Sequence, residues 1–176
     1  MTKRVSVFGG SRPRPGESAY EEAQHLGRLL GRAGYSVLTG GYIGTMEAVS
    51  RGVSENGGHV IGVTCDEIER WRPTGPNAWV MEEIRSTKIL DRLFTLVERC
   101  DAAIALPGGI GTLTEISLMW TLMSTNSIPQ RPLILVGRGW RDTFREMFKT
   151  QASYIPEGQR QALTCVDDVE RAFAEL

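Results

Sequence analysis

Two glycine-rich segments of this chain have the composition of phosphate-binding loops. Each follows a short apolar run and leads directly into a stretch with helical periodicity. Glycine tolerates positive φ and close backbone approach, so successive N–H groups can converge on an anion at the positive end of a helix. We therefore expect both loops to bind one phosphate. The candidate residues are Gly40, Gly41, Gly44 and Thr45 in the first loop, and Pro107, Gly108, Gly109, Gly111 and Thr112 in the second.

A third turn follows the first expected strand and adds Gly10 and Ser11 to the candidate site. The alternative is that all these glycines only make tight turns between strands and helices. Neither loop matches the Walker A pattern, because no Lys-Ser or Lys-Thr follows the last glycine, and neither fits GxGxxG cleanly. Hydrolysis at a γ-phosphate and nicotinamide-dependent redox chemistry are therefore disfavoured.

Two charged residues are candidates for catalysis. Glu115 lies one turn into the helix that the second loop opens, where its carboxylate can face a developing cationic sugar or an attacking water. The alternative is a capping box, in which Thr112 and Glu115 satisfy backbone N–H groups at the helix start. Arg92 precedes the second loop and offers the planar fork that binds phosphate, although an ordinary solvated face of charges is the simpler interpretation.

Composition narrows the possible ligands. The 176 residues suit a single domain spanning 1–176, and a formal net charge of −1 without a basic tract argues against nucleic acid or an anionic membrane as partner. Three scattered cysteines and two histidines form no metal-binding pattern, so we expect no metal and no cofactor. No signal peptide or membrane span is recognisable, which predicts a cytoplasmic protein with a small-molecule ligand.

Strand and helix patterns alternate along most of the chain. Short apolar strands are expected at 4–8, 35–39, 59–63, 101–106, 132–136 and 162–166, with helices at 18–33, 44–55, 87–99, 112–123, 139–149 and 169–176. Residues 64–80 read as an irregular excursion across the carboxyl edge of the sheet, forming a lid or wall. This alternation predicts an α/β Rossmann-like three-layer sandwich, with a mostly parallel sheet and helices on both faces.

The helix after the second loop is apolar nearly all round, which a helix covering a sheet does not need. Burial in a homodimer interface is the preferred explanation, and packing within the core is the alternative.

These motifs resemble the Lonely Guy (LOG) family. Residues 107–115 match its PGGxGTxxE motif, residues 40–47 look like its other glycine motif, and residues 7–11 look like its first strand and turn. The resemblance extends from about Val5 to Met123. It departs at Arg92-Leu93, where the family commonly has an Arg-Lys pair preceded by methionine.

The resemblance implies a Rossmann-like homodimer, or a higher homo-oligomer, that hydrolyses the N-glycosidic bond of a purine or cytokinin nucleoside 5′-monophosphate such as AMP. The products are free base and ribose 5-phosphate. Glu115 and Arg92 take the family's catalytic positions. Members are often mislabelled lysine decarboxylases, but no pyridoxal phosphate signature surrounds the lysines of this chain. The alternative is a noncatalytic nucleotide-binding or molybdenum cofactor carrier protein.

Overall fold

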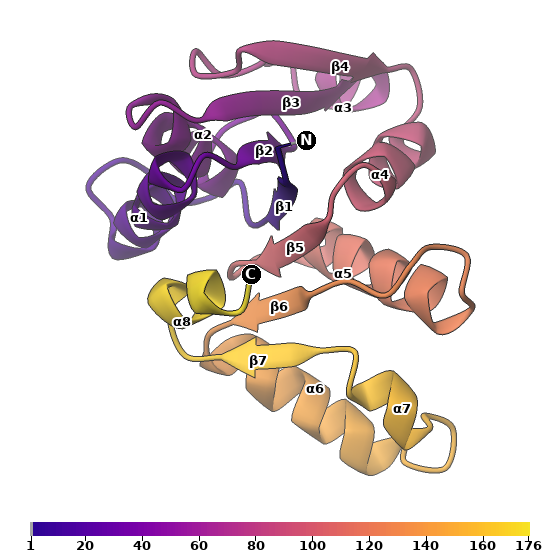
Figure 1. The fold of residues 1–176 in the computed structure, drawn as a ribbon. Coiled ribbons are helices and arrows are strands. Elements are labelled where there is room, and N and C mark those ends of the chain that lie inside the picture. The colour runs from indigo at the N-terminus through magenta and orange to yellow at the C-terminus, as the bar shows by residue number, and fades with distance from the viewer. Residues whose placement is uncertain (1) are drawn as a thin grey trace.

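The protein is built on one parallel sheet whose strand order is β4-β3-β2-β1-β5-β6-β7 (Figure 1). The computed structural model describes residues 2–176. The strands are β1 (Arg4–Phe8), β2 (Ser36–Thr39), β3 (His59–Cys65), β4 (Glu82–Ser86), β5 (Ala102–Ala105), β6 (Leu133–Val136) and β7 (Thr164–Val166). Every neighbouring pair is parallel, so the mostly parallel sheet expected from the alternating pattern is confirmed.

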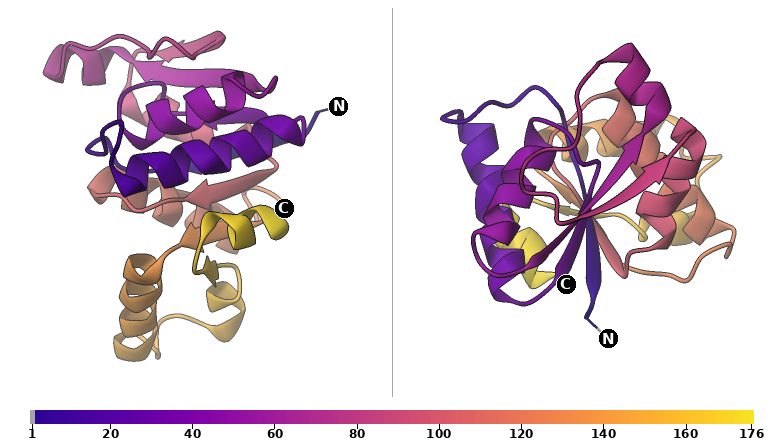
Figure 2. Two further views of the ribbon diagram at one scale, coloured as in Figure 1. Left: turned by 90° about the vertical axis from the view of Figure 1, so that its left-hand side faces the viewer. Right: turned by 90° about the horizontal axis from the view of Figure 1, so that it is seen from above.

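Helices cover both faces of this sheet, which makes the three layers of the predicted sandwich. They are α1 (Ser18–Arg32), α2 (Thr45–Ser54), α3 (Asp66–Trp71), α4 (Ile89–Glu98), α5 (Ile110–Ser124), α6 (Arg138–Thr150), α7 (Glu157–Arg160) and α8 (Val169–Ala174). Figure 2 shows α1, α2 and α8 on one side and α4, α5 and α6 on the other. Along residues 2–176, no helix has both the length and the apolar character to cross a membrane.

Alternate residues of the central strands fill two separate cores. In β1, Val5 and Val7 pack with α1 and α2, whereas Phe8 packs with α4 and α5. This follows from the two-residue period of a strand, and burial on both faces explains why these strands are apolar without interruption. Within β1 the buried polar exception is Ser6, which donates a hydrogen bond of 2.6 Å to the Leu96 carbonyl of α4.

The strand order places the glycine loops next to one another. From β1 the chain moves outward through β2, β3 and β4, then returns to β5 on the other side of β1 and continues through β6 and β7. The switch point therefore lies between β1 and β5, and ligands of open α/β sheets bind beside such a point at the carboxyl ends of the strands. Since β2, β1 and β5 are neighbours, the three turns that follow them share one edge.

The segment expected to be irregular contains regular structure. Residues 64–80 include the end of β3 and the helix α3, and the edge strand β4 follows, which the sequence did not predict. The short helix α7 was also missed. The strand β4 reads Glu-Glu-Ile-Arg-Ser and is half-exposed at the sheet edge, so it lacks the apolar alternation by which strands are recognised. Its register comes from pairing with β3.

Candidate functional site

Backbone contacts join the turns that follow β1, β2 and β5. The Gly10 N–H donates to the Pro107 carbonyl at 3.1 Å, and the Thr45 N–H donates to the Gly10 carbonyl at 2.9 Å. The turn after β1 thus links both glycine loops. The predicted phosphate-binding residues are thereby brought together at one edge, despite their separation in sequence.

Glycine is required where these turns touch. Gly44 has φ +77°, and a Cβ atom on it would lie 2.6 Å from the carbonyl carbon of Ser11. A Cβ atom on Gly10 would lie 3.4 Å from the Gly108 Cα. Side chains at Gly44 would therefore force the turns apart. Some of these glycines are therefore needed for the close packing of the turns, as the alternative of tight strand-to-helix turns proposed.

The second loop leaves the amino end of α5 open. Gly109 is the N-cap residue, no side chain caps the helix, and the first helical hydrogen bond runs from the Leu113 N–H to the Gly109 carbonyl at 3.0 Å. Within residues 2–176, the N–H groups of positions 110–112 have no backbone acceptor. A Cβ atom on Gly109 or Gly111 would meet no neighbour within 4 Å. This arrangement has the geometry of helix termini that bind anions, and it leaves open space in front of the unbonded N–H groups.

Glu115 is buried one turn into the same helix, with 8% of its surface exposed. The capping-box interpretation of Thr112 and Glu115 is wrong, because neither side chain caps α5. The carboxylate instead faces Arg92, with 3.8 Å between Glu115 Oε1 and Arg92 Nη1. Burial raises the pKa of Glu115 to about 7, while the positive charge of Arg92 acts in the opposite direction. A carboxyl with such a pKa can gain or lose a proton near neutral pH.

Arg92 is equally buried, with 6% of its surface exposed, so the interpretation of Arg92 as part of a solvated face is wrong. Its Nε donates to the Val63 carbonyl at 2.7 Å, which fixes the side chain to the end of β3. Its guanidinium lies against Gly40 and 5.9 Å from the centre of the Tyr42 ring. Arg92 therefore stands between the first loop and Glu115, held by contacts made on three sides.

The first loop is supported by contacts that the sequence did not reveal. Asn77, from the segment between α3 and β4, donates through Nδ2 to the carbonyls of Gly41 and Tyr42 at 3.0 and 2.9 Å. The Gly41 N–H donates to Thr39 Oγ1, and the Thr45 N–H is taken by Gly10. Two of the amides expected to face the ligand thus bind protein groups. The second loop has the larger share of open N–H donors.

Tyr42 buries its side chain behind Arg92 rather than extending it into the site. The Cys65 N–H donates to the Tyr42 hydroxyl at 2.8 Å, and Glu69 lies 3.3 Å from the same oxygen. Burial is the largest influence on the hydroxyl and raises its pKa. An aromatic residue inside a glycine loop was the available signal that this position packs inward.

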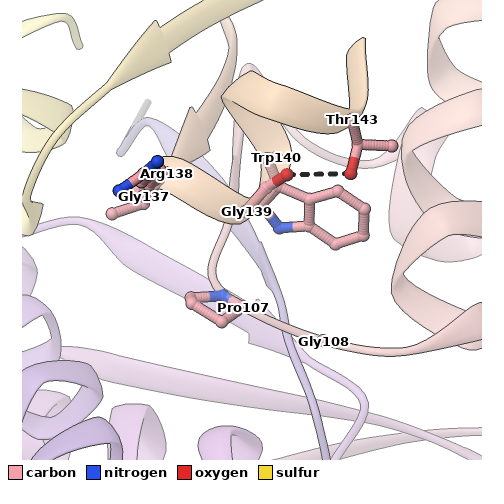
Figure 3. A pocket seen from close by; sticks show the side chains of 8 residues that line it. Pro107, Gly108, Gly137, Arg138, Gly139, Trp140 and Thr143 are labelled. Carbon is pink, nitrogen blue, oxygen red and sulfur yellow. Dashed lines mark hydrogen bonds between the residues drawn. The ribbon is translucent and has the colours of Figure 1, made fainter. Parts of the chain in front are cut away.

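A cavity of about 270 Å³ lies beside the second loop on the β6 side (Figure 3). Pro107 and Gly108 line it together with the amino end of α6, whose Trp140 donates its indole N–H to the Leu106 carbonyl at 3.0 Å. Arg92 and Glu115 do not line this cavity. The loop therefore separates the buried ion pair from a hollow that the sequence did not predict.

Comparison with known proteins places the chain in a family. The profile of the SLOG cluster4 family matches residues 2–161. The chain belongs to the SLOG cluster4 family. The resemblance to LOG proteins is confirmed by curated relatives of this SLOG chain. A rice (Oryza sativa subsp. japonica) protein named probable cytokinin riboside 5′-monophosphate phosphoribohydrolase LOGL9 is 35% identical over 72% of this chain and 56% of its own length.

Other relatives of this SLOG protein carry related names. The rice protein named cytokinin riboside 5′-monophosphate phosphoribohydrolase LOG is 34% identical over 92% of this chain and 67% of its own length. A protein of that enzyme name from Rhodococcoides fascians is 26% identical over 99% of this chain and 89% of its own. The chain spans about half the length of the first two rice relatives, at 56% and 46%.

Solved structures show the same SLOG-type fold. The molybdenum cofactor binding protein from Rippkaea orientalis has a TM-score of 0.76 at 23% identity, covering 99% of this chain and 94% of its own. The molybdenum cofactor carrier protein from Chlamydomonas reinhardtii has a TM-score of 0.73, also at 23% identity, covering 99% and 95%. At this identity, the likeness establishes the architecture alone.

Proposed function

We propose that this protein hydrolyses the N-glycosidic bond of a purine or cytokinin nucleoside 5′-monophosphate, releasing free base and ribose 5-phosphate. The observation that carries the proposal is the uncapped amino end of α5, one helical turn from the buried Glu115–Arg92 pair. An anion-binding terminus and a carboxyl with a pKa of about 7 are thus rigidly joined in one helix. The names of the curated relatives support the same activity.

The mechanism follows from this arrangement. The open amides of the second loop hold the 5′-phosphate, and Arg92 contributes positive charge and orients the nucleotide. Binding at the phosphate positions the ribose over Glu115. As the C1′–N bond breaks, its electron pair leaves with the base and the ribose gains oxocarbenium character, which the ionised Glu115 stabilises. Water adds at C1′ while Glu115 accepts its proton; the departing base takes up one proton from solvent and Glu115 returns one to solvent, so that the free base and ribose 5-phosphate are the products.

The test is to incubate the protein with AMP and other nucleoside monophosphates and to assay ribose 5-phosphate. Glu115→Gln keeps the shape of the side chain but removes its charge and basicity, so kcat should fall by about 10²- to 10⁴-fold. Arg92→Ala should lower kcat/KM as well. Because the pKa of Glu115 is about 7, wild-type kcat/KM should rise as the pH increases through that value, and this rise should be absent from the residual activity of Glu115→Gln.

A carrier that binds a phosphorylated ligand intact is the second candidate, favoured by the fold shared with molybdenum cofactor binding proteins. Such a protein needs the glycine loops to bind its ligand. It has no need of a buried carboxyl such as Glu115, because removing a carboxyl from water costs free energy. Tight AMP binding without release of ribose 5-phosphate would favour the carrier. Release that depends on Glu115 would exclude it.

A further inference from the structure

Arg72 is a cation at the candidate site that the proposed mechanism does not yet use. It is the last residue before the segment that crosses from α3 to β4, and its Nη1 donates to Ser11 Oγ at 3.2 Å. Ser11 directly follows Gly10, which contacts the second loop through Pro107. The guanidinium of Arg72 therefore reaches the turn that joins both glycine loops.

The environment of Arg72 leaves its charge unneutralised. Its Nε is buried and has no hydrogen-bond acceptor within the described part of the chain. Among residues 2–176, no carboxylate forms a salt bridge with it, whereas Arg85 contacts three carboxylates and Arg92 contacts Glu115. A buried donor without an acceptor is costly, and an acceptor supplied by a ligand removes that cost.

Arg72 is also held in place from its own segment. Its guanidinium carbon lies 5.8 Å from the centre of the Trp71 ring, and the crossing segment is fixed to the first loop by the hydrogen bonds of Asn77. The guanidinium thus lies beside the neighbouring ring, and the segment that follows Arg72 is tethered to the first loop. A guanidinium held in this way presents donors to an anion without a large loss of side-chain entropy.

We propose that Arg72 is a ligand-binding residue that contacts the phosphate of the nucleotide from the side opposite α5. This inference rests on the proposed function, because it uses the same phosphate position. Ser11 orients the guanidinium when the site is empty. When a phosphate binds, its oxygens supply acceptors to the remaining N–H groups of Arg72. Discrimination between a nucleoside monophosphate and the uncharged nucleoside then depends on this side chain.

The experiment measures binding of AMP and of adenosine by titration calorimetry, in the Glu115→Gln background so that AMP is not consumed. Arg72→Ala should weaken AMP binding by about 10- to 100-fold and leave adenosine binding unchanged, because charge-assisted hydrogen bonds to the phosphate are lost. The matched control is Arg70→Ala, which removes an exposed arginine of α3, two residues before Arg72, and should bind both ligands as the parent does. Arg72→Gln, which keeps a polar side chain but is shorter and uncharged, should also weaken AMP binding selectively.

Two outcomes separate this inference from the proposed function. If the wild-type protein releases no ribose 5-phosphate but its AMP affinity depends on Arg72, the hydrolase proposal falls and the role of Arg72 stands. If the wild-type protein hydrolyses AMP while folded Arg72→Ala and Arg72→Gln bind AMP as tightly as Arg70→Ala, the role of Arg72 is overturned. Should Arg72→Ala fail to fold, Arg72→Gln alone decides.

Discussion

Burial of Glu115 makes the stability of the protein depend on pH. In the unfolded chain its pKa is near the ordinary 4.5, and in the folded protein it is about 7. The folded state therefore keeps the proton to higher pH than the unfolded state does. The contribution of protonated Glu115 to the free energy of unfolding is complete below about pH 4.5 and is lost as the pH rises through about 7.

Replacement of this carboxyl should flatten the pH dependence of stability. Between about pH 5 and about pH 8, the free energy of unfolding of the wild-type protein should fall by roughly 2–3 kcal/mol more than that of Glu115→Gln, because only the wild type must ionise a buried carboxyl. Urea denaturation at both pH values measures this difference. Parallel curves for the two proteins would show that burial does not perturb Glu115.

Two glycines of the second loop, Gly109 and Gly111, face open space. Alanine at Gly109 or Gly111 meets no neighbour and needs no positive φ, so both variants should fold, with an unfolding free energy equal to or about 0.5–1 kcal/mol above the wild-type value. Their added methyl groups stand where the nucleotide approaches, so AMP affinity should fall at least about 10-fold. Gly158→Ala, in α7 and equally unobstructed, is the control and should bind normally. Unimpaired AMP binding by both loop variants would remove the second loop from the site.

At the scale of elements, the segment between α3 and β4 is fixed to the first loop mainly through Asn77. Asn77→Ala removes the side-chain hydrogen bonds to the Gly41 and Tyr42 carbonyls, leaves the backbone N–H bond to the Gly41 carbonyl, and should cost about 1–3 kcal/mol of stability. Amide hydrogen exchange should accelerate in residues 72–81 and in the first loop, but not in β5 or α5. Thr74→Ala, in the same segment but without a side-chain hydrogen bond among the described residues, is the control. Equal exchange in both variants would show that other contacts hold the segment.

At the scale of the whole molecule, part of the exposed apolar surface lies on α4 and at the start of α5. Leu90, Phe94 and Ile110 are 61%, 40% and 81% exposed. Part of the apolar character of α5 has another explanation, since Trp120 packs edge-on against Phe144 and Phe148 within the chain. The homodimer expected from the sequence, with the helix after the second loop in its interface, therefore remains a prediction. On the exposed residues, we now place that interface at α4 and the first turn of α5.

Sedimentation equilibrium tests this interface. We expect the wild-type protein to be a dimer and the Leu90→Glu/Phe94→Glu variant to be a monomer, because two charges cannot be buried against an apolar partner surface without pairing. Met147→Glu changes a comparably exposed residue of α6 and should leave the dimer intact. A monomeric wild type, or a charged double variant that still dimerises, would contradict the prediction.

The sequence determined the architecture of this protein. Buried strands appear in it as short apolar runs, and amphipathic helices appear as apolar residues at helical spacing, so both kinds of element can be recognised locally. It also indicated the glycine loops, since a turn from strand into helix needs glycine at particular positions. What it could not show was the edge strand β4, whose polar residues pair only because β3 lies beside them. The helix α3 and the clamp at Asn77 were missed for the same reason.

Only the tertiary structure decided how the polar residues of the site are used. Thr112 and Glu115 have the spacing of a capping box, and Arg92 has the setting of a surface charge, so local rules favoured ordinary roles for all three. Packing of α4 against α5 buries most of Arg92 and Glu115 and sets them 3.8 Å apart. Contacts between residues distant in sequence decide which side chains are buried, which charges pair and which helix ends lack a cap. Such contacts leave no recognisable pattern in a short stretch of sequence.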